Sequence, residues 1–237
     1  MDHILLSPFL RFRRLLITMD EVDASLEKFV FNTPCTVNIS GATSSGKSEF
    51  VFKIINERKW MFSESPVKVV YCFKAWQDRF QEIKDNDDNG HEIIFHEGLV
   101  QVTDIKTNGK HIVIVIDDLQ DQVKNMVDTF CVHSHHKNIS VFFINQNMFY
   151  KSPWMRTINL NSQYLVVMKL RRDLNGLKVL GNQLMPGMSK EFMSVYNECT
   201  TQKYSYLLIN IHPANSVRIS LHTNIFKDEI EFVYTPK

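Results

Sequence analysis

The residues whose types and spacing most clearly indicate a chemical role lie between positions 41 and 48. Their sequence, Gly41-Ala-Thr-Ser-Ser-Gly46-Lys47-Ser48, fits G-x-x-x-x-G-K-[ST], a spacing typical of loops that bind phosphate. Loop amides and a helix N-terminus offer a polyanion both hydrogen-bond donors and partial positive charge. We expect Lys47 to reach the β- and γ-phosphates and the Ser48 hydroxyl to hold Mg²⁺. The predicted nucleotide contacts are Gly41, Ala42, Thr43, Ser44, Ser45, Gly46, Lys47, Ser48 and Glu49.

A second candidate site lies at the end of an apolar run. The segment His111-Ile-Val-Ile-Val-Ile-Asp-Asp118 is typical of a strand that is covered on both faces. Ligands of open α/β sheets bind at the carboxyl ends of the strands. We therefore expect Asp117 to hold the Mg²⁺ shell, directly or through water, and Asp118 to orient or deprotonate the attacking water. Either acid could instead cap the helix that follows.

Gln146 is the third candidate, because it follows the strand predicted over 139–145. If that strand lies beside the one before the phosphate loop, Gln146 would project toward the γ-phosphate. A glutamine there can hydrogen-bond the attacking water or sense phosphate release. Polar residues are also common at strand ends without such a role.

The elements that must position these residues alternate between strands and helices. Strands are predicted over 35–40, 67–72, 92–96, 111–118, 139–145 and 164–169. Helices are predicted over 21–32, 49–57, 75–84, 120–133, 172–183 and 188–200. This alternation indicates an α/β P-loop NTPase fold, a doubly wound and mainly parallel sheet with helices on both faces.

Two later segments have the alternating pattern of an antiparallel pair. Residues 204–211 and 216–221 are joined by a short polar turn, which predicts a β-hairpin at the C-terminal edge of the sheet. We therefore expect one ATPase domain over 33–237, preceded by an N-terminal arm or helix over 1–32.

Composition excludes some classes of protein. The 237 residues carry a net charge of only +1, so no global basic field points to nucleic acid, although a local stripe fits this balance. The four cysteines are scattered without a C-x-x-C pair, and Cys35 and Cys72 lie in apolar runs typical of buried free thiols in a reducing compartment. No apolar run approaches the length of a membrane span.

The N-terminal residues mix apolar and basic side chains without the order of a signal peptide. We expect an amphipathic arm that docks on the body or on a neighbouring subunit, with a membrane-surface helix as the alternative. His133-Ser-His-His136 lacks the cysteine or carboxylate partners of a metal site, so these histidines are expected at a helix end. Trp154 and the pair Phe149-Tyr150 are expected to pack in the core or between subunits.

Five segments together resemble the genome-packaging ATPases of the FtsK/HerA superfamily, above all the poxvirus-like type of polinton and adintovirus-like DNA elements. The P-loop and the acid pair are generic, whereas the His-His-Lys-Asn, Gln-Asn and Arg-Asp segments in this order are specific. The resemblance covers about residues 33–225. The segments are 41–48, 117–118, 134–149, 156–165 and 169–173.

The resemblance implies a ring of identical subunits that uses ATP and Mg²⁺ to thread double-stranded DNA into a capsid. It implies a capsid or portal-type partner, a location inside the infected host cell and a place at the virion vertex. An arginine from one subunit would complete the neighbour's site, with Arg156 as the first candidate and Arg171 and Arg172 as alternatives. The candidates for DNA contact are Lys151, Arg171, Arg172 and Lys178.

Other classes share the phosphate loop. A P-loop small-molecule kinase would need a lid and an acceptor pocket, and no arginine-rich lid pattern is present. A cellular DNA-pumping ATPase of the same superfamily is a further alternative. A GTPase switch would need N-K-x-D, which the sequence lacks. A non-catalytic nucleotide-binding scaffold is disfavoured by the intact set of Lys47, Ser48, Asp117 and Asp118.

Overall fold

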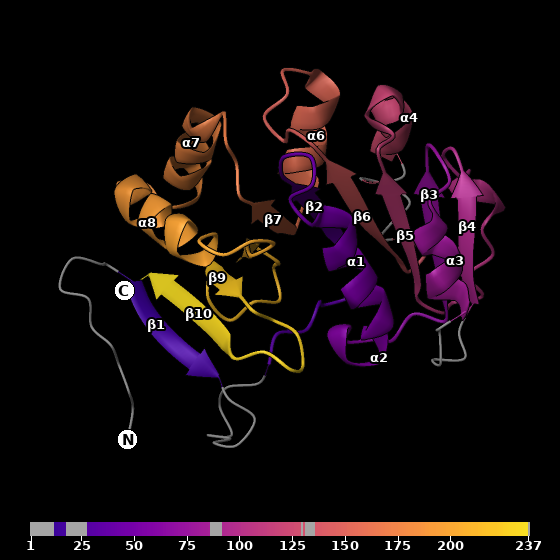
Figure 1. The fold of residues 1–237 in the computed structure, drawn as a ribbon, viewed down its shortest axis with the longest axis horizontal. Coiled ribbons are helices and arrows are strands. Elements are labelled where there is room, and N and C mark those ends of the chain that lie inside the picture. The colour runs from indigo at the N-terminus through magenta and orange to yellow at the C-terminus, as the bar shows by residue number, and fades with distance from the viewer. Residues whose placement is uncertain (1–11, 18–27, 86–91, 129, 131–135, 237) are drawn as a thin grey trace.

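The computed structural model describes residues 12–17, 28–85, 92–128, 130 and 136–236. Its strands form one ten-stranded sheet in the order β1-β10-β9-β8-β7-β2-β6-β5-β3-β4. Figure 1 shows this sheet running across the whole molecule, with β4 at one edge and β1 at the other. One sheet thus joins the strand before the phosphate loop to β1 and β10, the first and last strands of the described residues.

Six neighbouring strands are parallel and form the larger part of the sheet. The buried apolar runs of β5, β6 and β7 suit central positions, since both faces of a parallel sheet are covered, whereas β4 is a half-exposed edge strand. The central strand β2 pairs on one side with β6 and on the other with β7. The six are β2 (Thr36–Ser40), β3 (Lys68–Phe73), β4 (Glu92–Glu97), β5 (Ile112–Asp117), β6 (Ile139–Asn145) and β7 (Tyr164–Met168).

The remaining four strands continue the sheet in antiparallel pairs beyond β7. β8 and β9 form the expected hairpin, but β10 and β1 lie outside it, so the hairpin is not at the edge. β1 comes from the predicted N-terminal arm and pairs with β10 along its whole length. The four are β8 (Tyr206–Asn210), β9 (Ser220–Thr223), β10 (Glu231–Pro236) and β1 (Phe12–Ile17).

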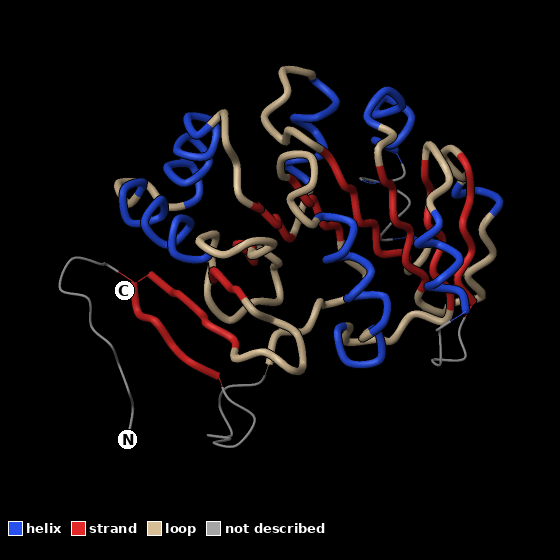
Figure 2. The backbone as a smooth tube through the Cα atoms, in the orientation of Figure 1, coloured by secondary structure: helices blue, strands red, loops and turns tan. Residues whose placement is uncertain are grey.

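Helices cover both faces of the sheet, as the sequence predicted (Figure 2). One face packs under α1, α2 and α3, and the other packs under α6 beside β5 and β6 and under α7 and α8 beside β7 and β8. The helices are α1 (Lys47–Asn56), α2 (Arg58–Met61), α3 (Asp78–Asp85), α4 (Val123–Asp128), α6 (Pro153–Asn161), α7 (Leu174–Leu184) and α8 (Ser189–Cys199). Two 3₁₀ turns are η1 (Val102–Asp104) and η2 (Gln120–Gln122).

The helix predicted over 21–32 is wrong for its described part. Residues 28–32 are extended, and Phe31 donates its amide to the Met61 carbonyl at 2.8 Å. Phe29 and Phe31 are both buried, so a period of two outweighs the helical pattern read from the sequence. Residues 21–27 lie outside the described residues.

One further helix prediction differs in extent from the structure, and one helix was not predicted. The helix expected over 120–133 is a 3₁₀ turn followed by α4, and residues 129 and 131–135 lie outside the described part. The helix α6 was missed, since no element was predicted over 153–161. Pro153 occupies its first turn, where a proline costs no hydrogen bond.

Cys35 and Cys72 are buried free thiols, as predicted. Burial raises the pKa of Cys35 to about 12 and that of Cys72 to about 11, so both thiols stay protonated. Among the described helices, none is both long and apolar enough to cross a membrane.

Candidate nucleotide-binding site

The loop between β2 and α1 is shaped by two glycines that cannot carry a side chain. Gly46 has φ 100°, a left-handed conformation that favours glycine, and α1 starts directly after it. A Cβ on Gly41 would lie 2.6 Å from Ser45 Oγ and 2.8 Å from Met168 Cβ. The loop closes with a hydrogen bond of 3.1 Å from the Ser45 amide to the Ala42 carbonyl. The first amides of α1 therefore open onto the turn of the loop, as an anion site requires.

Lys47 folds across this loop. Its Nζ donates to the Gly41 carbonyl at 2.8 Å and to the Ala42 carbonyl at 2.9 Å. Burial lowers the pKa of Lys47, and the charges of Asp117 and Asp118 oppose that shift. The ammonium thus lies within electrostatic reach of both acids, in the curve of the loop where phosphate oxygens would replace carbonyl oxygens.

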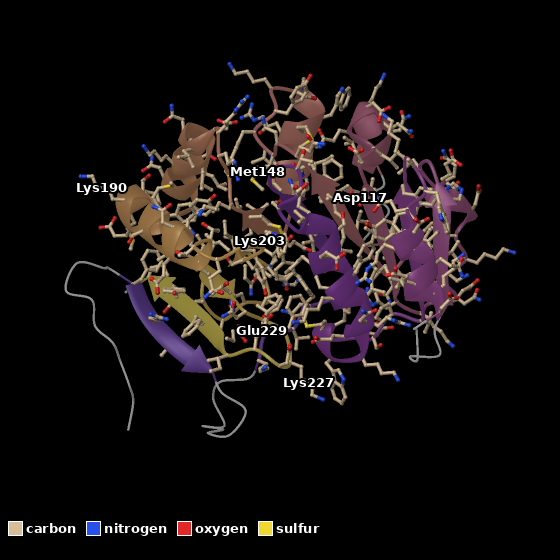
Figure 3. The ribbon with its side chains drawn as sticks, viewed as in Figure 1. Asp117, Met148, Lys190, Lys203, Lys227 and Glu229 are labelled. Carbon is tan, nitrogen blue, oxygen red and sulfur yellow. The ribbon has the colours of Figure 1, made fainter. Side chains whose placement is uncertain are left out.

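Asp117 connects the loop to β5. Its Oδ2 accepts hydrogen bonds from Ser48 Oγ at 3.0 Å and from Tyr71 OH at 2.6 Å. The carboxylate is 8% exposed, and burial raises its pKa against the opposing effect of the two hydroxyl donors. Figure 3 labels Asp117 at the upper end of β5, beside the start of α1. Two residues predicted separately from the sequence therefore meet in space.

This pair fits a divalent cation such as Mg²⁺. A hydroxyl and a carboxylate are the hard oxygen ligands that Mg²⁺ prefers, and they are already in contact here. The buried carboxylate makes no direct ion pair with the described residues, so a cation would offset its desolvation. Ser48 and Asp117 would hold the ion, with phosphate oxygens and water completing its shell.

Asp118 differs from its neighbour in conformation and exposure. It is exposed and has φ 55°, in the left-handed region that non-glycine residues seldom occupy. Aspartate tolerates this region better than most residues, and such outliers cluster at functional sites. Because of this turn, Asp118 is exposed directly after β5, at the carboxyl end of the strand beside Asp117.

Gln146 meets the topological condition set by the sequence, because β6 lies directly beside β2. Ser40 is opposite Asn145 in the register, so Gln146 follows at the level of the phosphate loop. Its side chain is exposed.

A chain of asparagine amides beneath Gln146 was missed from the sequence. Asn145 Nδ2 donates to Asn38 Oδ1, and Asn38 Nδ2 donates to Asn159 Oδ1. Asn159 then donates to the Met148 carbonyl at 2.5 Å. The Met148 amide donates to Ser40 Oγ at 3.1 Å. These bonds tie β2, β6 and α6 together and fix the loop that carries Gln146. The sequence signal for this chain was Asn38, a polar residue between Val37 and Ile39 in the predicted strand.

Tyr71 was also missed, since nothing local marks a tyrosine on β3 as a partner of Asp117. Glu49 was predicted to contact nucleotide, and its exposed carboxylate lies 3.4 Å from Arg79 Nη2 on α3.

Arg156 does not join the described contacts around the phosphate loop. It is exposed on α6 and lines a groove of about 1180 Å³ between α6 and α7. Leu160 and Val179 on the same groove are also exposed. Arg156 thus faces outward, where a neighbouring molecule would meet it.

The four lysines and arginines predicted to contact DNA are all exposed. Lys151, Arg171 and Arg172 follow the carboxyl ends of β6 and β7, at the edge of the sheet that holds the phosphate loop. Lys178 lies on α7.

The aromatic residues expected to pack in the core or between subunits are partly exposed. Phe149 packs against Gly176, where a Cβ would lie 2.4 Å from its ring. Tyr150 and Trp154 are exposed. His133 and His135 lie outside the described residues, and the described part of the chain holds no cluster of metal-ligating side chains.

No protein-family model matches the sequence, and a search of curated proteins gives no match. Among solved structures, the genome packaging NTPase B204 from Sulfolobus turreted icosahedral virus 2 in complex with ATP-gammaS is similar at a TM-score of 0.49. It is 13% identical over 81% of this chain and 98% of that chain. A crystal structure of B204, the DNA-packaging ATPase from Sulfolobus turreted icosahedral virus, has a TM-score of 0.49 and 14% identity, over 81% of this chain and 98% of that one. These are likenesses of backbone architecture between very different sequences.

The fold is that of a P-loop NTPase. A central parallel strand leads through a glycine loop into a helix, and the strand that ends in an acid lies two places away, beyond β6. The contact between Ser48 and Asp117 joins the two halves of this arrangement.

Proposed function

We propose that this chain is a Mg²⁺-dependent ATPase that is stimulated by double-stranded DNA and packages viral DNA into a capsid as a ring of identical subunits. The observation that carries the ATPase is the hydrogen bond of 3.0 Å between Ser48 on the phosphate loop and Asp117 on β5. The resemblance of the segments at 134–149, 156–165 and 169–173 to the FtsK/HerA packaging ATPases carries the choice of packaging.

The residues of the site divide the work of hydrolysis. The loop amides and Lys47 would bind the phosphates, and Lys47 would neutralise charge on the β- and γ-phosphates. Mg²⁺, held by Ser48 and Asp117, would supply further charge neutralisation. Gln146 would orient the attacking water, and Asp118 would orient it or accept its proton. Each of these side chains comes from the same edge of the sheet.

The site would be completed by a second subunit. The Arg156 side chain is exposed on α6 and makes none of the described contacts of its own phosphate loop, so it suits a role in trans. Arg171 and Arg172 remain the alternatives. The exposed Lys151, Arg171, Arg172 and Lys178 would contact DNA phosphates. A capsid or portal-type protein and a place inside the infected host cell, at the virion vertex, belong to the same proposal.

The test is steady-state ATP hydrolysis with and without double-stranded DNA. We expect DNA to raise the rate of ATP hydrolysis. Lys47→Ala should abolish hydrolysis, whereas Lys190→Ala, on the exposed face of α8, should leave the rate unchanged. Equal rates with and without DNA would contradict the motor, and transfer of phosphate to a small acceptor would favour a kinase. Mass measurement with an ATP analogue and DNA should give a closed oligomer.

The trans arginine has its own test. Arg156→Ala should bind ATP and fail to hydrolyse it. Mixed with Lys47→Ala, it should recover part of the activity, because mixed rings contain interfaces with one intact loop and one intact arginine. No recovery at any mixing ratio would exclude Arg156 as the trans residue.

A further inference from the structure

Tyr204 stands against the phosphate loop in an unusual conformation. It lies in the turn between α8 and β8, has φ 67°, and is 54% exposed. The left-handed region is a genuine outlier for a bulky aromatic residue. A conformation of that kind persists only when the surroundings impose it.

The ring packs directly on the backbone of Gly46. A Cβ at Gly46 would lie 2.9 Å from Tyr204 Cδ1, 3.1 Å from its Cβ and 3.3 Å from its Cγ. Gly46 therefore serves twice, by allowing the left-handed turn of the loop and by leaving room for this ring. The contact is between residues that are far apart in the sequence.

The neighbouring residues hold Tyr204 in place. Tyr206 begins β8 and packs its ring on Phe50 of α1, with centroids 4.6 Å apart. Ser205 Oγ donates to the Gln202 carbonyl at 2.7 Å, which closes the turn. Lys203 places its Nζ 4.6 Å from the centroid of the Tyr204 ring. One face of the ring is thus covered by the ammonium group, and over half of the side chain remains in solvent.

Tyr204 and Asp117 flank the phosphate loop on opposite sides. In the strand order β8-β7-β2-β6-β5, the strand β2 that carries the loop is central, with β8 two places to one side and β5 two places to the other. Figure 3 shows the same relation, with the labels of Lys203 and Asp117 on either side of α1. Lys47, Ser48 and Asp117 define the γ-phosphate end of a bound triphosphate, so its nucleoside end leaves toward β7 and β8.

We propose that Tyr204 is the nucleobase platform of this site and stacks on the purine of the bound nucleoside triphosphate, on the ring face that Lys203 leaves open. The inference rests on the proposed function for the nucleotide and adds the residue that recognises its base. Aromatic side chains stack on bases through their π faces, and such stacking tolerates any base because every base has a π face. An exposed ring fixed against the loop suits this role because little freedom is lost on binding.

The test compares ATP with inorganic tripolyphosphate, which has the phosphates and no base, by isothermal titration calorimetry. Tyr204→Asn removes the ring and keeps a residue that tolerates the left-handed region. We expect it to weaken ATP binding about tenfold or more and to leave tripolyphosphate binding unchanged. Tyr204→Phe keeps the ring and should bind ATP like the wild type.

Trp60→Asn is the matched control, since Trp60 on α2 is an exposed aromatic residue with a lysine ammonium, that of Lys227, 4.8 Å from its ring centroid. It should change neither affinity. Wild-type affinity for ATP in Tyr204→Asn would overturn the inference, as would an equal loss for both ligands, which would assign Tyr204 to the shape of the loop. If the wild type binds tripolyphosphate and ATP equally, no base platform exists. If it binds neither, the proposed function itself fails, and the inference with it.

Discussion

Asp117 and Glu231 are both buried carboxylates, but their surroundings differ. Asp117 lies at the carboxyl end of β5 and accepts two hydroxyl hydrogen bonds, both on Oδ2. Glu231 begins β10 and uses both oxygens, with His222 Nδ1 at 2.7 Å from Oε1 and the Phe29 amide at 2.9 Å from Oε2. The exposed fraction is 8% for Asp117 and 0% for Glu231.

The difference separates a binding group from a structural one. Glu231 is fully compensated and joins the segment at Phe29 to β10 and, through His222, to β9. Ser220, His222 and Glu231 form a hydrogen-bonded row, but all three are buried, so it is no catalytic triad that a substrate could reach. Asp117 is under-compensated and faces the phosphate loop. A buried carboxylate of that kind gains from a cation, whereas Glu231 gains nothing.

The largest effect is expected for Asp117→Asn. The neutral amide would weaken the hold on Mg²⁺ and lower the rate of ATP hydrolysis by at least about 100-fold. Burial raises the pKa of Asp117 in the folded state, so its ionised form costs stability above that pKa, and the cost disappears as the pH falls toward the unfolded value. Asp117→Asn should therefore have an equal or higher Tm at neutral pH without metal, measured by calorimetry. A strongly lowered Tm would make Asp117 a structural group.

Glu231→Gln should show the opposite pattern. The neutral amide would lose the charge-assisted character of the hydrogen bonds with His222 Nδ1 and the Phe29 amide. We expect a loss of about 2 kcal/mol in the free energy of unfolding, measured by urea denaturation. The rate of hydrolysis per folded molecule should be unchanged. Glu97→Gln, at an exposed position on β4, is the control for stability. Lost activity with intact stability would contradict the comparison.

Tyr71→Phe tests how Asp117 is compensated. It removes one hydroxyl donor, which should raise the pKa of Asp117 further and destabilise the ionised protein by about 1–2 kcal/mol. The pKa is measured from the carboxyl carbon resonance in the metal-free protein. Tyr164→Phe is the matched control, because that buried hydroxyl accepts from the Asn32 amide instead. An unchanged pKa in Tyr71→Phe would mean that the hydroxyl does not support the charge.

The smallest effect is expected for Ser40→Ala. It removes the acceptor of the Met148 amide beneath Gln146, a single neutral hydrogen bond worth about 1 kcal/mol. If that bond positions Gln146, kcat should fall a few-fold while the affinity for ATP, measured by calorimetry, stays the same. An effect on affinity alone would place the role of Ser40 in the phosphate loop.

The parallel part of the sheet was more accessible to prediction than the antiparallel part. Strands β5, β6 and β7 carry apolar runs that show burial on both faces without knowledge of their neighbours. β1 and β10 were missed because an edge pair is defined by its partner: Phe12 is opposite Pro236 across the whole length of the chain. The extended course at Phe29 and Phe31 was misread for the same reason, since β10 and α2 supply its contacts.

The phosphate loop, the acids at 117 and 118 and the alternation of strands and helices could all be predicted from the order of the residues alone. These are local signals, because a glycine turn and a buried run are encoded within a few neighbouring residues. Only the tertiary structure decided that Tyr71 and Ser48 share Asp117, that asparagines hold the loop of Gln146, and that Tyr204 stands on Gly46. Each of those contacts joins residues that only the packing of the sheet brings together, so no local pattern could mark them.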